Sequence, residues 1–591
     1  SDDYKQPAAN IPLYDDISVY AFWVRINDDE ATSADLFEFT ALDDGTYSIS
    51  CAEGAALPED IILPNSYQGK LVTAIARGAF KNTPIKSIRL PVGIAEIGIE
   101  AFYGCQNLSQ ITFDEYNKLT KIGDFAFYQN TALTSIAIAE NIEEIGDYAF
   151  YGCSSLIFLD MPSENNLWRI GDYAFAQSDE IAEINISSKI VTIGDYAFSD
   201  LAYTLLLLGE LNSLESVGKF AFLNCLGFNN FNAPNIMSIG QGAFAGCANL
   251  TDLTIIGNIP IVDYFGEESF PESYEVSQIA PQRDIHGNFV YDDKNNLVMI
   301  NTRARLPLAL KTIRFRNGVE NIVDNTLNNC VGVHNIYLPS TVKNIGKYAF
   351  AAQNGDPNNL MKPGVLSLGQ NSLLETIGDG AFYGRTTFTH ITLPQGLKRI
   401  GNDAFRTAHR LLTVELLSSE NLEFVGKEAF LNTDWYSSGA DGVVYLGDIA
   451  LGYKGLLTQG INLVFRQGVK AIAPYAFSRI ENIASVNIPQ TVITVHEGAF
   501  SECRGIKTAV ISEGVAEIGD RAFENCSSLT NVSLPQSLQT LGPNVFYGCE
   551  QIAVISLYGD HTLGDLFGVG SFNGSYKATQ MKLDTQSFVV E

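Results

Sequence analysis

One hexapeptide organises this chain. Ile-Gly-Asp-Tyr-Ala-Phe stands at 145–150 and again at 193–198, and looser versions recur along most of the 591 residues. Within an unbroken run the closing Phe residues lie 22–25 positions apart. They are Phe80, Phe102, Phe127, Phe150, Phe175, Phe198, Phe222, Phe244, Phe350, Phe382, Phe405, Phe430, Phe477, Phe500, Phe523 and Phe546. A fixed period of this size predicts stacked repeats, each too small to bury its own apolar face.

A single repeat, residues 108–127, contains two short apolar runs joined by polar connections. In the first run Ile111 alternates with Gln110 and Thr112, which predicts a strand with apolar residues inside and polar residues outside. The second run ends at Gly123, where the chain turns. The Asp after this glycine is expected to accept hydrogen bonds from the amides of a short helical turn that carries Ala-Phe.

The alternation of L-x-x-I-x-L-P with V-x-x-I-G-x-x-A-F-x-x-C resembles the BspA-like leucine-rich repeats over roughly residues 60–560. The resemblance implies a β-rich solenoid, in the α/β class by leucine-rich-repeat convention. It would be a right-handed curved stack of coils with short helical turns and hairpin insertions. A solenoid grows by adding coils, so the length of this chain measures coils and not globular domains.

Breaks in the repeat divide the chain into five predicted segments. They are an N-terminal segment and cap at 1–36, a first repeat stack at 37–259, an irregular module with a hairpin insertion at 260–308, a second stack at 309–560 with a hairpin insertion at 434–460, and a degenerate C-terminal coil at 561–591. Sequence does not show whether the native protein continues beyond residue 591.

Several local features refine this division. The run 17–26 predicts a strand that covers the open end of the stack, and Asp43-Asp44-Gly45 predicts a hairpin. Two further hairpins are expected, one around 292–296 and one around Gly447-Asp448. Four consecutive leucines, 205–208, place one or two leucines on an outward face.

Composition narrows the environment and the partners. A net charge of −30 and a pI near 4.5 argue against nucleic acid or an anionic membrane as the main partner. No apolar run is long enough to span a membrane. The first residues, Ser1-Asp2-Asp3, do not look like a signal peptide. Because the resemblance implies export, we expect a chain from which a targeting segment has been removed, with a lipid anchor left open.

Eight of the nine cysteines occupy one repeat position, shortly after the repeat Phe. Neighbouring coils would bring Cys225 within reach of Cys247, and Cys503 within reach of Cys526. Cys105 and Cys153 have no cysteine in the coil between them, and Cys51 stands apart from the repeats. We therefore predict a column of buried free thiols, with bridges between adjacent coils as the alternative.

No catalytic motif emerges from the sequence. Nucleophile elbows, zinc motifs and phosphate loops are missing, and His496-Glu497 lacks the second histidine of a zinc-protease motif. We predict neither enzyme activity nor a catalytic residue, cofactor or metal. Carboxylates could still pair between coils, which keeps a hydrolase as a second alternative.

The outward positions of the first strand form two columns across the stack. Most are small and polar, as on an ordinary solvated sheet face. Two groups of exceptions become candidate binding residues. They are Phe158, Asp160, Glu183 and Asn185 in one place, and Arg314, Tyr337 and His390 in another. Tyrosines directly after the repeat Phe form a further column, which we interpret as packing. This column contains Tyr103, Tyr128, Tyr151, Tyr383 and Tyr547.

The absence of a catalytic motif and the resemblance to the BspA-like family together favour a binding protein. Members of the resembled family look like surface antigens and adhesins. The hypothesis is a monomeric, secreted or cell-surface bacterial protein that recognises host matrix or cell-surface proteins. The alternative is a glycan-capturing protein, for which aromatic residues of the second insertion would group on one outward face. They are Trp435, Tyr436, Tyr445 and Tyr453. The ligand and the binding face stay undetermined at this point.

Overall fold

The computed structural model describes residues 30–113, 118–258, 261–266, 273–282, 290–292, 298–352, 363–457, 460–557, 581–584 and 587–590. The predicted cap strand at 17–26 lies outside these residues. The chain forms two compact units. The first contains Ser1–Thr251, Tyr264–Tyr274 and Ala304–Ala309, and the second contains Asp252–Asp263, Glu275–Arg303 and Leu310–Glu591. The five-segment division stays a prediction.

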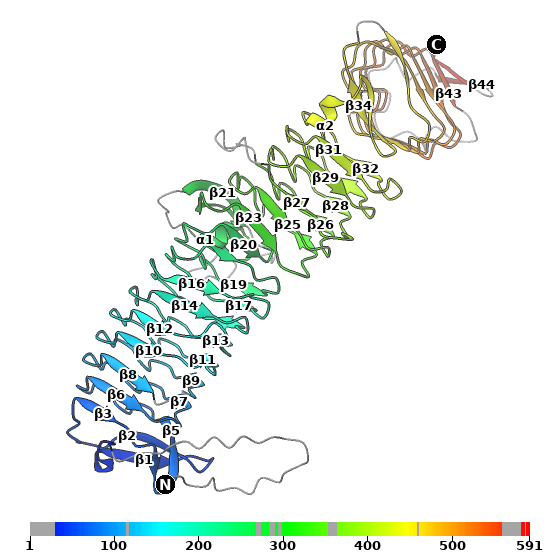
Figure 1. Ribbon diagram of the computed structural model, residues 1–591. Helices are drawn as coiled ribbons and strands as arrows, with labels where there is room; N and C mark the ends of the chain where they lie inside the picture. The colour runs from blue at the N-terminus through cyan, green and yellow to red at the C-terminus, as the bar shows by residue number, and fades with distance from the viewer. Residues whose placement is uncertain are drawn as a thin grey trace. The chain divides into compact units, whose positions relative to one another are not determined.

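In the first unit each regular coil contributes two short parallel strands, and consecutive coils stack on each other (Figure 1). The first strands of these coils are β3 (Asp60–Ile62), β6 (Ser87–Leu90), β8 (Gln110–Phe113), β10 (Ser135–Ala137), β12 (Phe158–Asp160), β14 (Glu183–Ile186), β16 (Leu205–Leu208) and β18 (Asn230–Phe231). The second strands are β5 (Lys70–Ile75), β7 (Glu96–Ile97), β9 (Lys121–Ile122), β11 (Glu144–Ile145), β13 (Arg169–Ile170), β15 (Thr192–Ile193), β17 (Ser216–Val217) and β19 (Ser238–Ile239).

The first unit opens with the predicted hairpin. After the 3-10 turn η1 (Ala34–Leu36), β1 (Phe37–Ala41) runs antiparallel to β2 (Tyr47–Cys51). Strand β2 then pairs in parallel with β5, and the short β4 (Ser66–Tyr67) pairs antiparallel with β5. The hairpin therefore joins the sheet made by the second strands of the coils.

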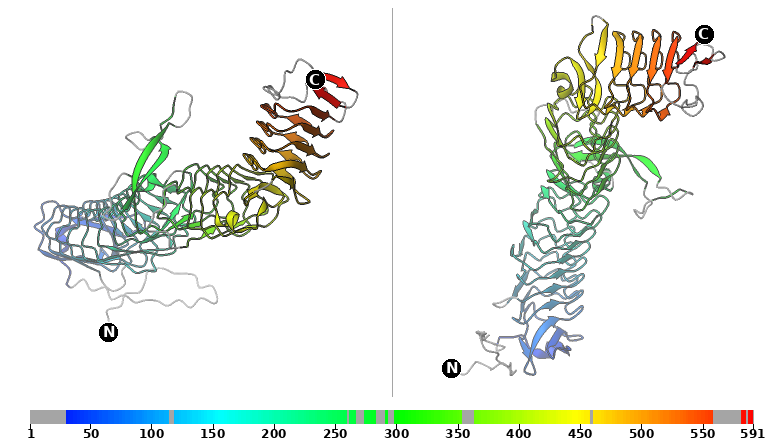
Figure 2. Two further views of the ribbon diagram at one scale, coloured as in Figure 1. Left: turned by 90° about the horizontal axis from the view of Figure 1, so that it is seen from above. Right: turned by 90° about the vertical axis from the view of Figure 1, so that its right-hand side faces the viewer.

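The second unit repeats the same plan (Figure 2). Its first strands are β20 (Asp252–Ile255), β23 (Thr312–Phe315), β25 (Asn335–Tyr337), β27 (Leu366–Ser367), β29 (His390–Leu393), β31 (Thr413–Leu416), β35 (Ile461–Val464), β37 (Ile483–Ile488), β39 (Thr508–Ile511), β41 (Asn531–Leu534) and β43 (Val554–Leu557). Its second strands are β24 (Asn321–Ile322), β26 (Asn344–Ile345), β28 (Thr376–Ile377), β30 (Arg399–Ile400), β32 (Phe424–Val425), β34 (Ile449–Lys454), β36 (Ala471–Ile472), β38 (Thr494–Val495), β40 (Glu517–Ile518) and β42 (Thr540–Leu541).

Three irregular stretches complete the chain. The helix α1 (Val262–Phe265) precedes β21 (Ser273–Pro281) and β22 (Met299–Pro307), which form a two-stranded sheet longer than the predicted hairpin. The helix α2 (Asp434–Ser438) precedes β33 (Gly442–Leu446), which pairs antiparallel with β34 and confirms the second predicted hairpin. At the end, β45 (Ser587–Val590) lies antiparallel between β43 and β44 (Met581–Asp584).

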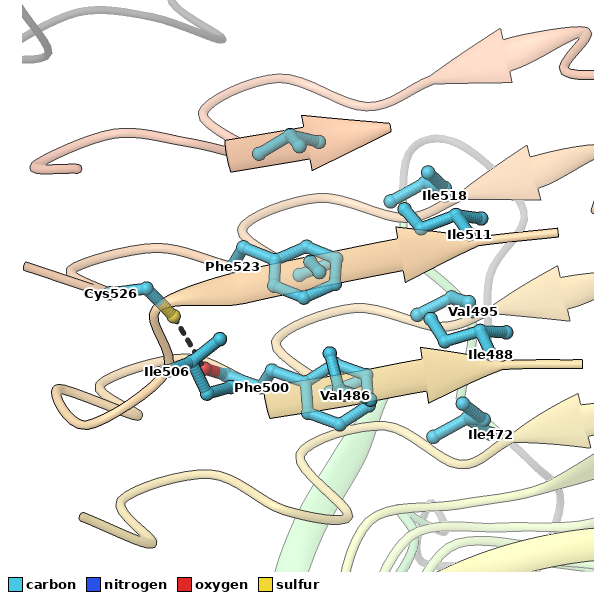
Figure 3. Packing of buried hydrophobic residues seen from close by; sticks show 14 of the residues in the cluster. Ile472, Val486, Ile488, Val495, Phe500, Ile506, Ile511, Ile518, Phe523 and Cys526 are labelled. Atoms are coloured by element: carbon cyan, nitrogen blue, oxygen red, sulfur yellow. Dashed lines mark hydrogen bonds between the residues drawn. The ribbon is translucent and has the colours of Figure 1, made fainter. Parts of the chain in front are cut away.

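The repeat Phe residues form the core of each stack, as the period predicts. Phe80 to Phe244 and Phe477 to Phe546 are fully or almost fully buried, and rings of consecutive coils stack with centroids 5.0–5.7 Å apart. Ile and Val side chains from both strands pack around these rings (Figure 3). Leu327, which replaces Phe in one coil, is also completely buried.

The corner that carries Ala-Phe is a turn and not the expected helical turn. The residue before Ala has positive φ, 54–55° at Tyr148, Tyr173 and Tyr196. Its amide donates to the next coil, as the Tyr148 amide does to the Asp172 carbonyl at 2.7 Å. A helical turn would direct these amides back into the same coil, and the left-handed residue directs them along the stack.

The aspartate of the repeat also bonds between coils, which corrects the predicted cap within one coil. Asp124 Oδ1 accepts the Asp147 amide at 2.9 Å, and Asp147 Oδ1 accepts the Asp172 amide at 3.0 Å. The series continues from Asp172 to Asp195 at 2.7 Å. Burial and the neighbouring carboxylates raise the pKa of Asp172. The preceding glycine has no room for a Cβ, because one at Gly146 would meet Asp124.

All nine cysteines are free, as predicted, and all except Cys51 are buried. Several of the buried thiols donate a hydrogen bond to a backbone carbonyl. Cys526 Sγ donates to the Phe500 carbonyl at 3.2 Å (Figure 3), and Cys153 Sγ donates to the Phe127 carbonyl at 3.1 Å. Burial raises the pKa of Cys153 to about 12. These thiols tie coils together without covalent bonds.

His496 packs against an aromatic ring in the second unit. The His496 ring meets the Phe424 ring edge-on with centroids 5.1 Å apart, and the Arg399 guanidinium lies 3.9 Å from the centre of the same Phe424 ring. His496 Nε2 is buried without a hydrogen-bond partner among the described residues. Burial and the Arg399 charge lower the pKa of His496 to about 4. The residue is a packed corner, as the sequence predicts.

Gly242→Ala should destabilise the first unit more than Gly78→Ala. Both glycines precede Ala-Phe with φ near 62–65°, but only a Cβ at Gly242 meets a ring, that of Phe220. Overpacking of this kind costs about 2 kcal/mol. Thermal unfolding followed by circular dichroism measures the difference. Adding Phe220→Ala should recover most of the loss in the Gly242 variant, and equal losses for both glycines would contradict this account.

Acidification should destabilise the second unit through His496. The unfolded chain protonates this histidine near its ordinary pKa of 6.5, whereas the folded chain does so only near 4. The free energy of unfolding therefore falls as pH drops from 6.5 towards 4, by at most about 1.4 kcal/mol per pH unit. His496→Gln should flatten this slope in urea titrations. His409→Gln, at an exposed histidine, should leave the slope unchanged.

Candidate functional site

The two predicted outward columns exist. Thr312 pairs with Asn335 and Arg314 pairs with Tyr337 in parallel register, and further along His390 pairs with Thr413. Side chains at these positions are exposed or half-buried. Thr254 is the exception, since it belongs to the predicted column yet is fully buried. Alternation along each first strand therefore places the candidate residues on one sheet face within each unit.

The first group of candidates lies on β12 and β14 of the first unit, in consecutive coils (Figure 1). The Ala182 amide donates to the Ile157 carbonyl at 3.0 Å, which fixes the two strands side by side. Phe158 is 63% exposed although it is a large apolar residue, and β12 is the edge strand of its five-stranded sheet. Asp160, on the same strand face, is exposed too.

Two leucines extend this group. On β16, Leu205 lies beside Glu183 and Leu207 lies beside Asn185. Their exposed fractions are 45% and 40%, which confirms the outward leucines expected from the sequence. We call Phe158, Asp160, Glu183, Asn185, Leu205 and Leu207 together the Phe158 patch. The sequence reasoning did not join the leucines to the patch, although the two-residue alternation carried the signal.

Hydrogen bonds hold the polar members of the Phe158 patch in place. Asn185 Nδ2 donates to the Met161 carbonyl and to Glu183 Oε1, both at 3.0 Å. Glu183 and Asn185 are half-buried, whereas the apolar members stand further into solvent. The patch thus combines three exposed apolar side chains with two carboxylates.

The second group of candidates is divided by the structure. The Arg314 guanidinium bonds both carboxylate oxygens of Asp252 at 2.9–3.1 Å and stacks 4.5 Å from the centre of the Tyr337 ring. Burial raises the pKa of Asp252 even though Arg314 opposes that shift. Arg314 and Tyr337 are therefore brought together, with the arginine charge already paired.

His390 lies two coils beyond Tyr337, with the β27 coil between them. Its Nε2 is 2.9 Å from Thr392 Oγ1, and Thr392 Oγ1 donates to Glu415 Oε2 at 3.1 Å. Because the single hydroxyl proton of Thr392 goes to Glu415, the hydroxyl oxygen accepts from His390 Nε2–H. In the neutral imidazole with this tautomer, Nδ1 is the acceptor.

A groove of about 550 Å³ opens beside His390. Its lining residues are Leu366, Ser367, Leu368, Gly369, Gln370, Asn371, Ser372, His390, Thr392, Pro394, Gln395 and Leu417. They come from the coils of β27, β29 and β31, and none carries a carboxylate. A smaller cavity of about 170 Å³ lies near Tyr436 and has one carboxylate in its lining, Glu428.

The aromatic residues of the second insertion do not form an outward cluster. Trp435 packs edge-on against Phe430 at 5.0 Å, and burial raises the pKa of Tyr436 to about 12. The Tyr445 hydroxyl accepts the Arg466 amide at 3.1 Å, and Tyr453 packs on the apolar core. These contacts give the four rings structural roles.

Of the tyrosines predicted to pack after the repeat Phe, three stack on each other, whereas Tyr547 is 41% exposed. Tyr103, Tyr128 and Tyr151 have centroids 4.8–5.1 Å apart, and all are half-buried. A second aromatic column lies beside them, which the sequence reasoning missed. It contains Phe125, Tyr148, Tyr173, Tyr196 and Phe220, with centroids 4.7–5.1 Å apart. Rings that stack face to face leave only their edges for a ligand.

In the described part of the chain, no three His, Cys, Asp or Glu side chains gather as a metal site would require. Within the same residues, no helix combines the length and the apolar character needed to cross a lipid bilayer.

Solved structures of several leucine-rich-repeat proteins resemble the chain. A Treponema pallidum protein, TpLRR, is 24% identical over 37% of this chain and 91% of its own, with a TM-score of 0.30. A leucine-rich cell surface protein from Faecalibacterium prausnitzii is 16% identical over 90% and 95%, with a TM-score of 0.29. The pneumococcal vaccine antigen PcpA is 17% identical over 78% and 91%, with a TM-score of 0.26. Among curated proteins, none matches the chain.

A family profile described as a BspA type leucine rich repeat region of six copies matches the chain in five places. The matched residues are 73–204, 210–306, 292–373, 365–438 and 458–578. These matches cover most of the chain. This chain therefore belongs to the BspA-type leucine-rich-repeat family.

Proposed function

We propose that this chain is a non-catalytic binding protein, secreted or held at a bacterial cell surface, that acts as a monomer and recognises a host matrix or cell-surface protein. Membership of the family supports the surface location, because BspA-like proteins are bacterial cell-surface proteins. The single observation that carries protein recognition is the Phe158 patch.

Exposed apolar side chains of this kind favour a protein partner. Phe158 and Leu205 stand in coils on either side of Glu183, and Leu207 stands beside Asn185. Water hydrates these exposed apolar side chains poorly, so burial of each against a partner is favourable. Aromatic residues at the centre of an interface carry much of its binding energy. Asp160 and Glu183 stand among these apolar side chains on a chain of net charge −30, which favours a partner that presents basic residues together with apolar ones.

Arg314 and Tyr337 make a weaker candidate. The charge of Arg314 is paired with Asp252, so a partner must either break this pair or use only the exposed edge of Tyr337. Removing a paired charge from water costs free energy that the partner would have to recover. We therefore rank the Phe158 patch above Arg314 and Tyr337.

Binding of the purified chain to an array of extracellular-matrix proteins tests this proposal. Phe158→Ala combined with Leu205→Ala should weaken saturable binding by about 2 kcal/mol, the scale of an interface hot spot. Val510→Ala is the matched control, since Val510 is an outward apolar residue, 42% exposed, outside the patch. A loss caused instead by Tyr337→Ala with His390→Ala would move the site to the second unit, and a chain that binds no matrix protein would contradict the proposal.

A further inference from the structure

The groove beside His390 arises from turn length. Between the last inward residue of the first strand and the leucine that opens the second run (Leu374, Leu397 or Leu422), the β27 coil has residues 369–373, the β29 coil has 394–396, and the β31 coil has 417–421. The middle turn is two residues shorter than its neighbours. A short turn between two longer ones leaves a notch in the surface, and the groove occupies this notch.

The first unit contains the same succession of turns, but its notch is closed. The turns are 162–166 after β12, 187–189 after β14 and 209–213 after β16. Asn165, only 2% exposed, donates to the Pro162 carbonyl at 2.7 Å. Ser187 Oγ donates to the Asn165 carbonyl at 2.8 Å. These two buried side chains occupy the space where the first long turn meets the short turn.

The second unit lacks the residues that close the notch. By position in the turn, Ser372 corresponds to Asn165 and Pro394 corresponds to Ser187. The shorter Ser372 side chain lacks the amide of Asn165, and Pro394 has no hydroxyl to donate. Two substitutions within one turn pattern therefore distinguish an open groove from a filled one.

The lining of the open groove selects a ligand class. Gln370, Asn371 and Gln395 are exposed amides that each offer a donor and an acceptor. Ser367, Ser372 and Thr392 add hydroxyl groups. Among the described residues that line the groove there is no arginine, lysine or carboxylate, and Glu415, behind Thr392, already accepts the hydroxyl hydrogen bond of that residue.

Hydroxyl-rich ligands fit these groups best, because each hydroxyl is both donor and acceptor. The acceptor lone pair on His390 Nδ1 suits a ligand O–H group, and Glu415 holds this tautomer through Thr392. The exposed side chain of Leu417 offers apolar surface for the C–H face of a sugar ring. A volume of about 550 Å³ lies in the usual range for small-molecule sites, roughly 300–1,000 Å³.

We propose that the groove formed by the β27, β29 and β31 coils binds a neutral oligosaccharide. This site is independent of the Phe158 patch, which lies in the other unit. A chain that binds protein through one unit and a saccharide through the other would hold both ligands at once.

Isothermal titration calorimetry of the whole chain tests the proposal with neutral hexasaccharides built from glucose, mannose, galactose or N-acetylglucosamine, and with a uronic-acid hexamer. At least one neutral hexamer should bind with one site per chain, and the acidic hexamer should not. Gln395→Ala should weaken binding about tenfold, the loss of roughly 1.4 kcal/mol. Gln490→Ala is the matched control, because Gln490 follows Pro489 at the same turn position outside the groove.

Refilling the notch gives the second variant. Ser372→Asn combined with Pro394→Ser copies the closed turn of the first unit and should abolish binding while the melting temperature stays within a few degrees. If this variant unfolds, the comparison of Gln395→Ala with Gln490→Ala tests the proposal by itself. No binding of any neutral hexamer, preference for the acidic hexamer, or equal affinity of the Gln395→Ala variant and the unmodified chain would each overturn the proposal.

Discussion

The close stacking of coils is the constraint on which the rest of this structure depends. Corner amides donate to carbonyls of the next coil, as Phe150 does to Ala174 at 2.8 Å, and this pairing sets the distance at which Phe rings stack. At that distance glycine is required wherever a corner meets backbone or a ring of the coil before it. The residues of the repeat motif are thus determined more by contacts between coils than by structure within one coil.

Sequence reasoning recovered those features that repeat with the motif. The Phe spacing predicted the core, and strand alternation predicted the outward columns, including the pairing of Arg314 with Tyr337. It misassigned the direction of the corner hydrogen bonds, because Asp147 can in principle bond its own turn or the next coil. Only the left-handed φ of Tyr148, which a tyrosine rarely adopts, decides between the two. The Asp252–Arg314 pair spans an insertion that interrupts the repeat, so no local sequence pattern predicts this ion pair.

Turn lengths carry information that the motif hides. Aligning coils on Phe makes them look equivalent, yet the turns after β27 and β31 are longer than the turn after β29. Where such turns are filled by side chains, as by Asn165 and Ser187, the surface closes and the coil stays structural. Where Ser372 and Pro394 replace them, the same backbone plan leaves a groove. The difference between a turn that is only structural and a turn that lines a groove therefore depends on the side chains at two positions and not on a new fold element.

The contrast between the two units follows from the same reasoning. A stack of coils offers one outward residue pair per coil, so a binding surface must be assembled from several coils whose residues depart from small polar types. In the first unit the departure is apolar, at Phe158, Leu205 and Leu207, which suits the protein partner we propose. In the second unit the positions equivalent to Glu183, Leu205 and Leu207 carry His390, Thr413 and Glu415, and the groove beside them suits the small polar ligand we propose. On these proposals, equal backbones with different side chains give one chain two different binding surfaces.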